Sequence, residues 1–180
     1  MEKKYKLTDE IDEIYLRKVY RIRALRDFRN VKKGDIGGFV EKEENLSHEG
    51  DCWIWYKAKV SHDAKVFGNA QIFERAIITD NACVYDNAKV CGEASVEYNA
   101  QIFDNALIYD KARVFGFVYG NARVYGKAVI CDNARIFGDI RILDDAYISN
   151  QVNISGNFEI RGKTLMVPRS EHLVDYVGRF

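Results

Sequence analysis

The side chains of this sequence best suited to proton transfer near neutral pH are three histidines, His48, His62 and His172. His48 stands close to Glu49 and Asp51, which makes it the candidate for a catalytic or metal-binding role. His62 lies in a turn-like sequence, and His172 follows an acidic residue near the end of the chain, which is typical of surface positions. No two histidines have the spacing of a metal-binding pair on a helix. The histidines therefore predict no catalytic centre and no metal site.

The cysteines and the acidic turns add no metal chemistry. The cysteines match neither a zinc spacing nor a disulfide framework, and they predict reduced thiols in a cytoplasmic protein: Cys52, Cys83, Cys91 and Cys131. Several turns carry an aspartate beside a small or amide residue, a pattern that resembles calcium ligands but that turn formation explains: Asp80, Asp86, Asp104 and Asp132. We therefore expect no cofactor.

A basic stretch near the N-terminus is the third chemical feature. Eight lysines and arginines fall within residues 17–33, together with Tyr20 and Phe28. Basic residues interleaved with aromatic ones are typical of nucleic-acid contacts, so Arg21, Arg23 and Arg26 are candidate contacts for a nucleic acid or another partner. Acidic runs flank the stretch and the formal net charge is zero, so pairing within the chain or a solvated face explains it better.

The element that would position all of these side chains is a repeat of six residues. AKVFGN from Ala64 and AQIFER from Ala70 show it, and an aliphatic residue recurs every six positions from Val60 to Val114. Apolar residues two and then four apart favour a strand over a helix, because alternate strand residues share a face. Gly-Asn and Asp-Asn pairs then form turns. The repeat predicts short parallel strands in stacked coils, whose Ala and Val side chains form the core.

These residues resemble a known family. An aliphatic residue followed four positions later by a small one is the pattern of hexapeptide-repeat left-handed β-helix proteins, and the segments NARVYG and DNACVYD look closest to YdcK-like and phage or prophage repeat proteins. The resemblance implies an all-β, single-stranded parallel β-helix over residues 54–160, left-handed and three-sided, with about six coils. Enzymes of that family mostly transfer acyl groups from coenzyme A with a histidine base, so this activity is an alternative.

Small caps are expected at both ends, because an open stack exposes core and strand edges. Residues 1–53 form the N-terminal cap or, alternatively, a partner-binding arm; it contains a helix from Leu7 to Val19, a strand over 20–24, and turns at glycines 34, 37 and 38. Residues 161–180 form a C-terminal cap or an exchange segment, with a short helix after Ser170.

One repeat is shorter than the others. The aliphatic spacing falls to four between Val114 and Val118, after which the six-residue period resumes as far as Ile160. We interpret the gap as a tightened corner that still counts as one side of the coil. The alternative is a local bend or pocket where a ligand or partner docks.

The residue after each aliphatic position points outward, and sorting these residues by side gives three unlike faces. The first face is mostly polar: Ser61, Thr79, Glu97, Phe115, Cys131 and Ser149. The second is an aromatic ladder: Phe67, Tyr85, Phe103, Tyr119, Phe137 and then Ser155. The third is partly aromatic: Phe73, Cys91, Tyr109, Tyr125, Leu143 and Arg161. Stacking alone stabilises neighbouring strands, but a row of exposed rings also predicts an interface, so we expect a homo-oligomer that buries at least one aromatic face.

The sequence as a whole predicts a non-catalytic scaffold that self-associates and binds a protein partner. Its resemblance to phage and prophage proteins implies a partner in the bacterial host, such as a defence component. Acyl transfer from coenzyme A and nucleic-acid binding through the basic stretch are the alternatives. The charged N-terminus is unlike a signal peptide and no apolar run is long enough to span a bilayer, so no membrane association is expected.

Overall fold

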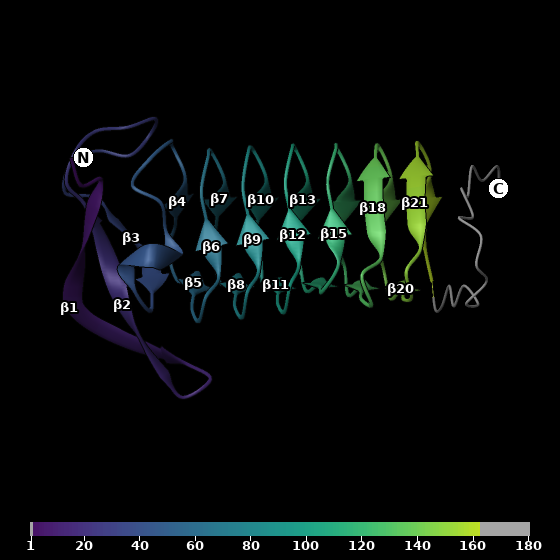
Figure 1. Cartoon of the computed structure of the whole chain (residues 1–180), viewed down its shortest axis with the longest axis horizontal. Helices are drawn as coiled ribbons and strands as arrows, with labels where there is room; N and C mark the ends of the chain where they lie inside the picture. The colour runs from purple at the N-terminus through teal and green to yellow at the C-terminus, as the bar shows by residue number, and fades with distance from the viewer. Residues whose placement is uncertain (1, 163–180) are drawn as a thin grey trace.

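The computed structural model describes residues 2–162, which form a three-sided solenoid of parallel β-strands (Figure 1). The only helical element among them is a single 3-10 turn, η1 (Glu43–Asn45). The predicted all-β, three-sided parallel fold is confirmed. Its left-handedness stays a prediction.

Each side of the solenoid is one sheet. The nine-stranded sheet runs β1 (Tyr5–Ile14), β2 (Arg17–Ala24), β3 (Ile36–Val40), β5 (Lys59–Val60), β8 (Ile77–Ile78), β11 (Ser95–Val96), β14 (Arg113–Val114), β17 (Val129–Ile130) and β20 (Tyr147–Ile148). The six-stranded sheet runs β6 (Lys65–Val66), β9 (Cys83–Val84), β12 (Gln101–Ile102), β15 (Phe117–Val118), β18 (Arg135–Gly138) and β21 (Asn153–Gly156). The seven-stranded sheet runs β4 (Trp53–Ile54), β7 (Gln71–Ile72), β10 (Lys89–Val90), β13 (Leu107–Ile108), β16 (Arg123–Val124), β19 (Arg141–Ile142) and β22 (Glu159–Ile160).

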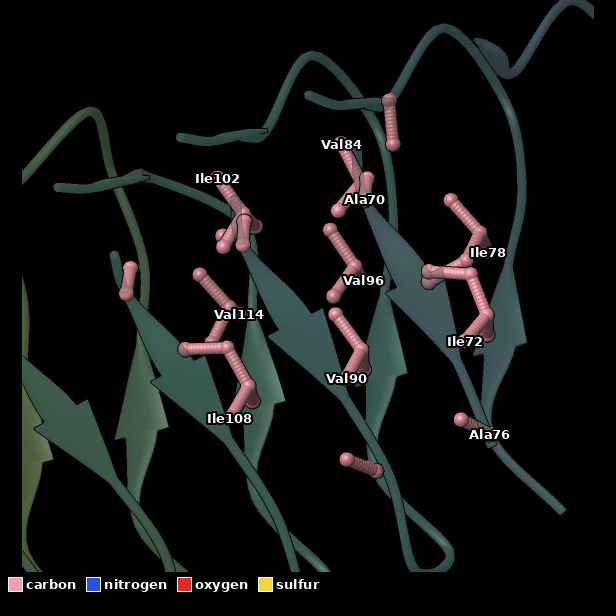
Figure 2. Packing of buried hydrophobic residues seen from close by; sticks show 14 of the residues in the cluster. Ala70, Ile72, Ala76, Ile78, Val84, Val90, Val96, Ile102, Ile108 and Val114 are labelled. Atoms are coloured by element: carbon pink, nitrogen blue, oxygen red, sulfur yellow. The ribbon is translucent and has the colours of Figure 1, made fainter. Parts of the chain in front are cut away.

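The core lies along the solenoid axis and consists of the repeated alanines and aliphatic residues. Ala64 is fully buried and Val66 is 1% exposed, and their counterparts in later coils are similarly buried as far as Ile148. Figure 2 shows these side chains pointing from neighbouring strands into one shared interior. Equivalent residues stack in parallel register, so that Val66 pairs with Val84. The predicted aliphatic core positions from Val60 to Ile154 are therefore buried, and the last one, Ile160, is half-buried.

The corners between strands use residues that accept a left-handed backbone. Asp80 and Asp110 both have a φ of 58°, in the region that Asp and Asn tolerate better than most residues. Their carboxylates accept backbone N–H groups of the next coil, from Tyr98 to Asp80 Oδ2 (2.9 Å) and from Gly126 to Asp110 Oδ2 (3.1 Å). These hydrogen bonds show that corner aspartates join successive coils.

The parallel stack begins earlier than the six-residue repeat and has about seven turns where six were expected. β3 pairs in parallel with β5, Leu46 forms a parallel bridge to Val66, and β4 pairs in parallel with β7. A first coil therefore exists before the regular repeat. Glycine is needed in β3, because a Cβ on Gly38 would lie 2.5 Å from the Ala58 carbonyl oxygen. The prediction of turns at Gly37 and Gly38 is therefore wrong, because both residues lie within strand β3.

The expected helix from Leu7 to Val19 is wrong, and an antiparallel hairpin of β1 and β2 takes its place. β2 also pairs with β3, so long-range hydrogen bonds outweigh the local helix signal of Thr8 and the acidic residues after it. The hairpin lies at the N-terminal end of the solenoid, and its turn projects to the side of the solenoid body, below it in Figure 1. The strand predicted at 20–24 is confirmed as part of β2. The second helix, after Ser170, lies outside the described residues.

The shortened repeat is a tight corner within an otherwise regular stack. Only Phe115 and Gly116 separate β14 from β15, and β15 still pairs with β12 and β18. The short repeat therefore forms one full side, as predicted. Gly116 replaces the usual alanine because a Cβ there would lie 2.5 Å from the Ala134 carbonyl oxygen.

Candidate functional site

The second face carries an unbroken stack of five aromatic rings on the outside of the six-stranded sheet. Successive ring centroids lie 4.8, 5.0, 4.7 and 4.9 Å apart, and neighbouring rings are within 5° of parallel. The rings belong to Phe67, Tyr85, Phe103, Tyr119 and Phe137. Their spacing matches the separation of hydrogen-bonded strands, because each ring extends from the same position of its coil. We call this row the aromatic ladder.

The aromatic ladder lies outside the axial core. Phe67 is 38% exposed at the N-terminal end of the row, and the four rings after it are half-buried. Each ring covers the faces of its neighbours and leaves an edge at the surface. The ladder is therefore both an internal support for the sheet and a continuous apolar strip.

The third face carries two separate aromatic pairs. Trp55 stacks on Phe73 at 6.2 Å, and Tyr109 stacks on Tyr125 at 4.5 Å. Cys91 occupies the position between the two pairs, so this face has no continuous strip. Burial, followed by the neighbouring Tyr125, raises the pKa of Tyr109 to about 12. Trp55 lies in the first coil, before the regular repeat, and sequence sorting did not include it.

The first face combines a buried hydroxyl cluster with an exposed aromatic pair. Thr79 Oγ1 lies 2.7 Å from His62 Nδ1 and 3.2 Å from Ser61 Oγ. Ser61 is fully buried and Thr79 is 2% exposed, so neither hydroxyl is placed to attack a substrate. Further along, Tyr98 is 60% exposed with a φ of 56° and packs edge-on against Phe115 at 5.3 Å. Sequence sorting missed Tyr98, because it stands where most corners have Asp or Gly.

His48 is held in the N-terminal region with both ring nitrogens engaged. The Lys4 backbone N–H donates to Nδ1 (3.1 Å), so Nε2 carries the proton and donates to Glu43 Oε1 (2.7 Å). The ring stacks on Tyr5 at 4.5 Å. Hydrogen bonds from Lys3 and then His48 hold the pKa of the Glu43 carboxyl below its usual range. This arrangement fixes the start of the chain against residues 43–48 and gives His48 no free nitrogen for proton transfer.

A buried lysine and a buried cysteine form the deepest polar contact of the same region. Lys4 Nζ lies 3.0 Å from the Cys52 carbonyl oxygen and 3.2 Å from Cys52 Sγ, and both residues are fully buried. Burial lowers the pKa of Lys4 and raises that of Cys52. All four cysteines are free thiols. Among the residues that the structure describes, no three His, Cys, Asp or Glu side chains gather into a metal-binding group.

An open cavity of about 480 Å³ lies where the N-terminal region meets the aromatic ladder. Phe67 supplies its exposed apolar surface over the buried Leu46 and Val66, and Glu43 and Glu44 line its acidic side. Lys65 is also part of the lining. We call this cavity the cap groove; it adjoins the first ring of the ladder.

The basic stretch is partly used inside the chain. Arg21 donates to the carbonyl oxygens of Gly37 (3.0 Å) and Tyr56 (2.7 Å), pairs with Glu10 and lies 4.0 Å over the Phe39 ring. Arg23 is exposed on the same strand, and the Arg26 guanidinium lies 5.8 Å from the Phe28 ring centroid. Arg21 therefore fastens the hairpin to the first coil and is not a free cation.

Part of the six-residue repeat matches a known repeat family. The model of the YdcK beta solenoid repeat matches residues 100–116 and 117–132, two adjacent segments that meet at the tight corner after Gly116. Residues 100–132 are therefore similar to YdcK-type solenoid repeats. No curated protein matches the sequence. The match over residues 100–132 agrees with the observed parallel solenoid and includes two rings of the ladder, Phe103 and Tyr119. Within residues 2–162 no helix has the length and apolar character needed to cross a membrane.

We expect the protein to lose stability above about pH 9–10. Burial raises the pKa values of Tyr5 and the Cys52 thiol, and that of Tyr109 rises to about 12. A group whose pKa is higher in the folded than in the unfolded state holds its proton more tightly when the protein is folded. Its contribution to the free energy of unfolding is complete below the unfolded-state pKa and is lost as pH rises through the folded-state pKa. Burial lowers the pKa of Lys4, so the contribution of Lys4 to stability increases with pH until pH reaches the ordinary pKa of 10.5.

Thermal unfolding measured from pH 8 to pH 11 checks this expectation. The melting temperature should fall over that range, and Tyr109→Phe should make the fall shallower because it removes one of the groups. A melting temperature that is constant or rises toward pH 11 would contradict the prediction.

Proposed function

We propose that this chain is a non-catalytic scaffold that self-associates and binds a protein partner through the outward faces of its solenoid. The observation that carries the proposal is the aromatic ladder, a straight apolar strip over five successive coils with one edge of every ring at the surface. Contiguous apolar strips of this kind are typical of protein–protein interfaces. The pairs Phe73–Trp55 and Tyr109–Tyr125 form a secondary surface in this proposal.

Two observations weigh against the alternatives. His48 has both nitrogens engaged, and His62 Nδ1 faces two buried hydroxyls, so neither histidine is arranged as the base of an acyltransferase. Arg21 is fixed by bonds within the chain, which leaves Arg23 and Arg26 of the three candidate contacts available to a nucleic acid. A rigid scaffold needs neither feature.

Light scattering coupled to size exclusion tests the self-association. The wild-type mass should be a multiple of the 20.7 kDa chain at micromolar concentration. Tyr85→Glu places a charge in the middle of the aromatic ladder and should shift the mass toward that of a single chain. Tyr98→Glu is the matched control, since it changes an exposed aromatic on another face, and it should leave the mass unchanged. A monomeric wild type would reject the proposal.

The partner is proposed from resemblance: the repeats are similar to those of phage and prophage proteins, so a bacterial host protein, such as a defence component, is the candidate. Immobilised wild-type protein should retain such a partner from host lysate, whereas Tyr85→Glu should not and Tyr98→Glu should. Equal capture by all three proteins would place the binding surface away from the ladder.

A further inference from the structure

The turn of the β1–β2 hairpin combines strain with exposed apolar side chains. Tyr15 and Leu16 form its two-residue connection, with φ values of 46° and 64°. Both central residues of such a turn adopt the left-handed backbone, which strongly favours Asn-Gly and disfavours bulky residues. Leu16 is nonetheless 98% exposed and Tyr15 61% exposed. A strained turn that holds apolar side chains in water is explained by a contact outside this chain.

The hairpin holds this turn in a fixed position. Ile14 and Val19 pack with Phe39 and Ile77 on the outside of the nine-stranded sheet. Lys59 Nζ pairs with Asp12 Oδ2 (2.8 Å) and donates to the Glu13 carbonyl oxygen (2.8 Å). The turn is therefore presented by a supported arm.

The cap groove has the complementary features. It is an open, partly apolar cavity of about 480 Å³ with Phe67 exposed at its edge. Glu44 and Lys65 line it, and neither is in an ion pair within the described part of the chain. Beside the turn stand Lys18 and Glu13, whose side chains likewise form no ion pair with any described residue. The turn therefore offers an unpaired cation, Lys18, and an unpaired anion, Glu13. The groove offers Lys65 and Glu44 in the same way.

We propose that the Tyr15–Leu16 turn of one copy inserts into the cap groove of a second copy, with Lys18 facing Glu44 and Glu13 facing Lys65. The partner is a second copy because the arm is packed on the nine-stranded sheet, whereas the groove opens beside the six-stranded sheet, so the turn does not reach its own groove. The contact joins two different surfaces, so it is a head-to-tail contact. It rests on the self-association proposed above and continues onto the ladder at Phe67.

Direct pairing of the free β1 edges is a poorer route to the same assembly. β1 is the outer strand of its sheet and has a register irregularity between Leu7 and Ile11. It also carries four acidic residues, Asp9, Glu10, Asp12 and Glu13. Two copies of this strand would bring like charges together, which disfavours strand addition.

Sedimentation velocity over a concentration series tests the turn-in-groove contact. Leu16→Asp should weaken self-association more than about tenfold, because it removes the apolar contact with Phe67 and places a further negative charge near Glu43 and Glu44. Its fold should be unchanged, since Leu16 is almost fully exposed. Lys18→Glu and Glu44→Lys should each weaken association at least about threefold, and the double variant should recover wild-type affinity.

Mixing supplies a second measurement. Leu16→Asp keeps its groove and Phe67→Asp keeps its turn, so the two variants, each impaired alone, should form a one-to-one complex when combined. The proposal is overturned if Leu16→Asp associates like wild type, if the charge exchange fails to restore affinity, or if the mixture shows no complex. A wild type that stays monomeric would reject the self-association itself. If Tyr85→Glu dissociates the assembly and Leu16→Asp does not, only the turn-in-groove contact is rejected.

Discussion

Replacing Ile102 with alanine is expected to lower the free energy of unfolding by about 2–5 kcal/mol. Ile102 is fully buried in β12 and stacks in register between Val84 and Val118. The coils on either side are fixed by backbone hydrogen bonds, such as Phe103 N–H to the Val118 carbonyl oxygen (3.2 Å), so they cannot close the space that the lost side chain leaves. A cavity in the middle of the solenoid should remain.

Denaturant unfolding followed by circular dichroism measures the Ile102→Ala effect. Lys89→Ala is the control, because Lys89 is an exposed strand residue two repeats before Ile102, and it should change stability by less than about 0.5 kcal/mol. Similar losses in both variants would show that stability does not depend on the axial core.

Gly116→Ala is the second substitution with a large expected effect, a loss of about 1–3 kcal/mol. The added Cβ would lie 2.5 Å from the Ala134 carbonyl oxygen, which belongs to the backbone of the next coil. That carbonyl accepts the Phe117 N–H (2.8 Å), so moving it away would disturb the strand pairing of β15. Neither atom is at the end of a flexible side chain, so the structure has no inexpensive adjustment.

A companion variant separates this crowding from a general need for glycine. The coils on both sides have the full spacing, from Val96 to Ile102 and from Ile130 to Ile136. Inserting Asn-Ala after Gly116 restores the six-residue repeat, moves Gly116 to an ordinary corner and should preserve stability in the same unfolding measurement. If the insertion lowers the free energy of unfolding more than Gly116→Ala does, the short corner contributes to stability in a way that the contact with the Ala134 carbonyl does not explain.

The solenoid could be predicted from the sequence because its physics is local. An alanine and an aliphatic residue two positions apart must share a strand face, and their regular return sets the stacking of Val66 on Val84. The same regularity places Tyr85 between Phe67 and Phe103 in the ladder. The roles proposed for these residues in assembly remain predictions.

The N-terminal region could not be predicted because its contacts are distant in sequence. β2 pairs with β3, and Lys4 binds the carbonyl oxygen of Cys52, neither of which leaves a periodic signal. Thr8 and the acidic residues after it favoured a helix locally, and no Gly or Asn marked the turn at Tyr15. Tyr98 escaped notice for a related reason, since it occupies a corner that usually belongs to Asp or Gly.

The even spacing of the aromatic ladder makes the solenoid a molecular ruler. Centroids separated by 4.7–5.0 Å repeat over four successive steps, with Phe and Tyr alternating, so a ligand that stacks at one step finds a ring at the same spacing at the next. A short ligand would therefore occupy several equivalent positions and slide among them, whereas a ligand with a matching repeat would gain affinity with every step it spans. A distinctive feature at one end is needed to fix the register of such a ligand on the ladder, and Phe67 at the edge of the cap groove provides it.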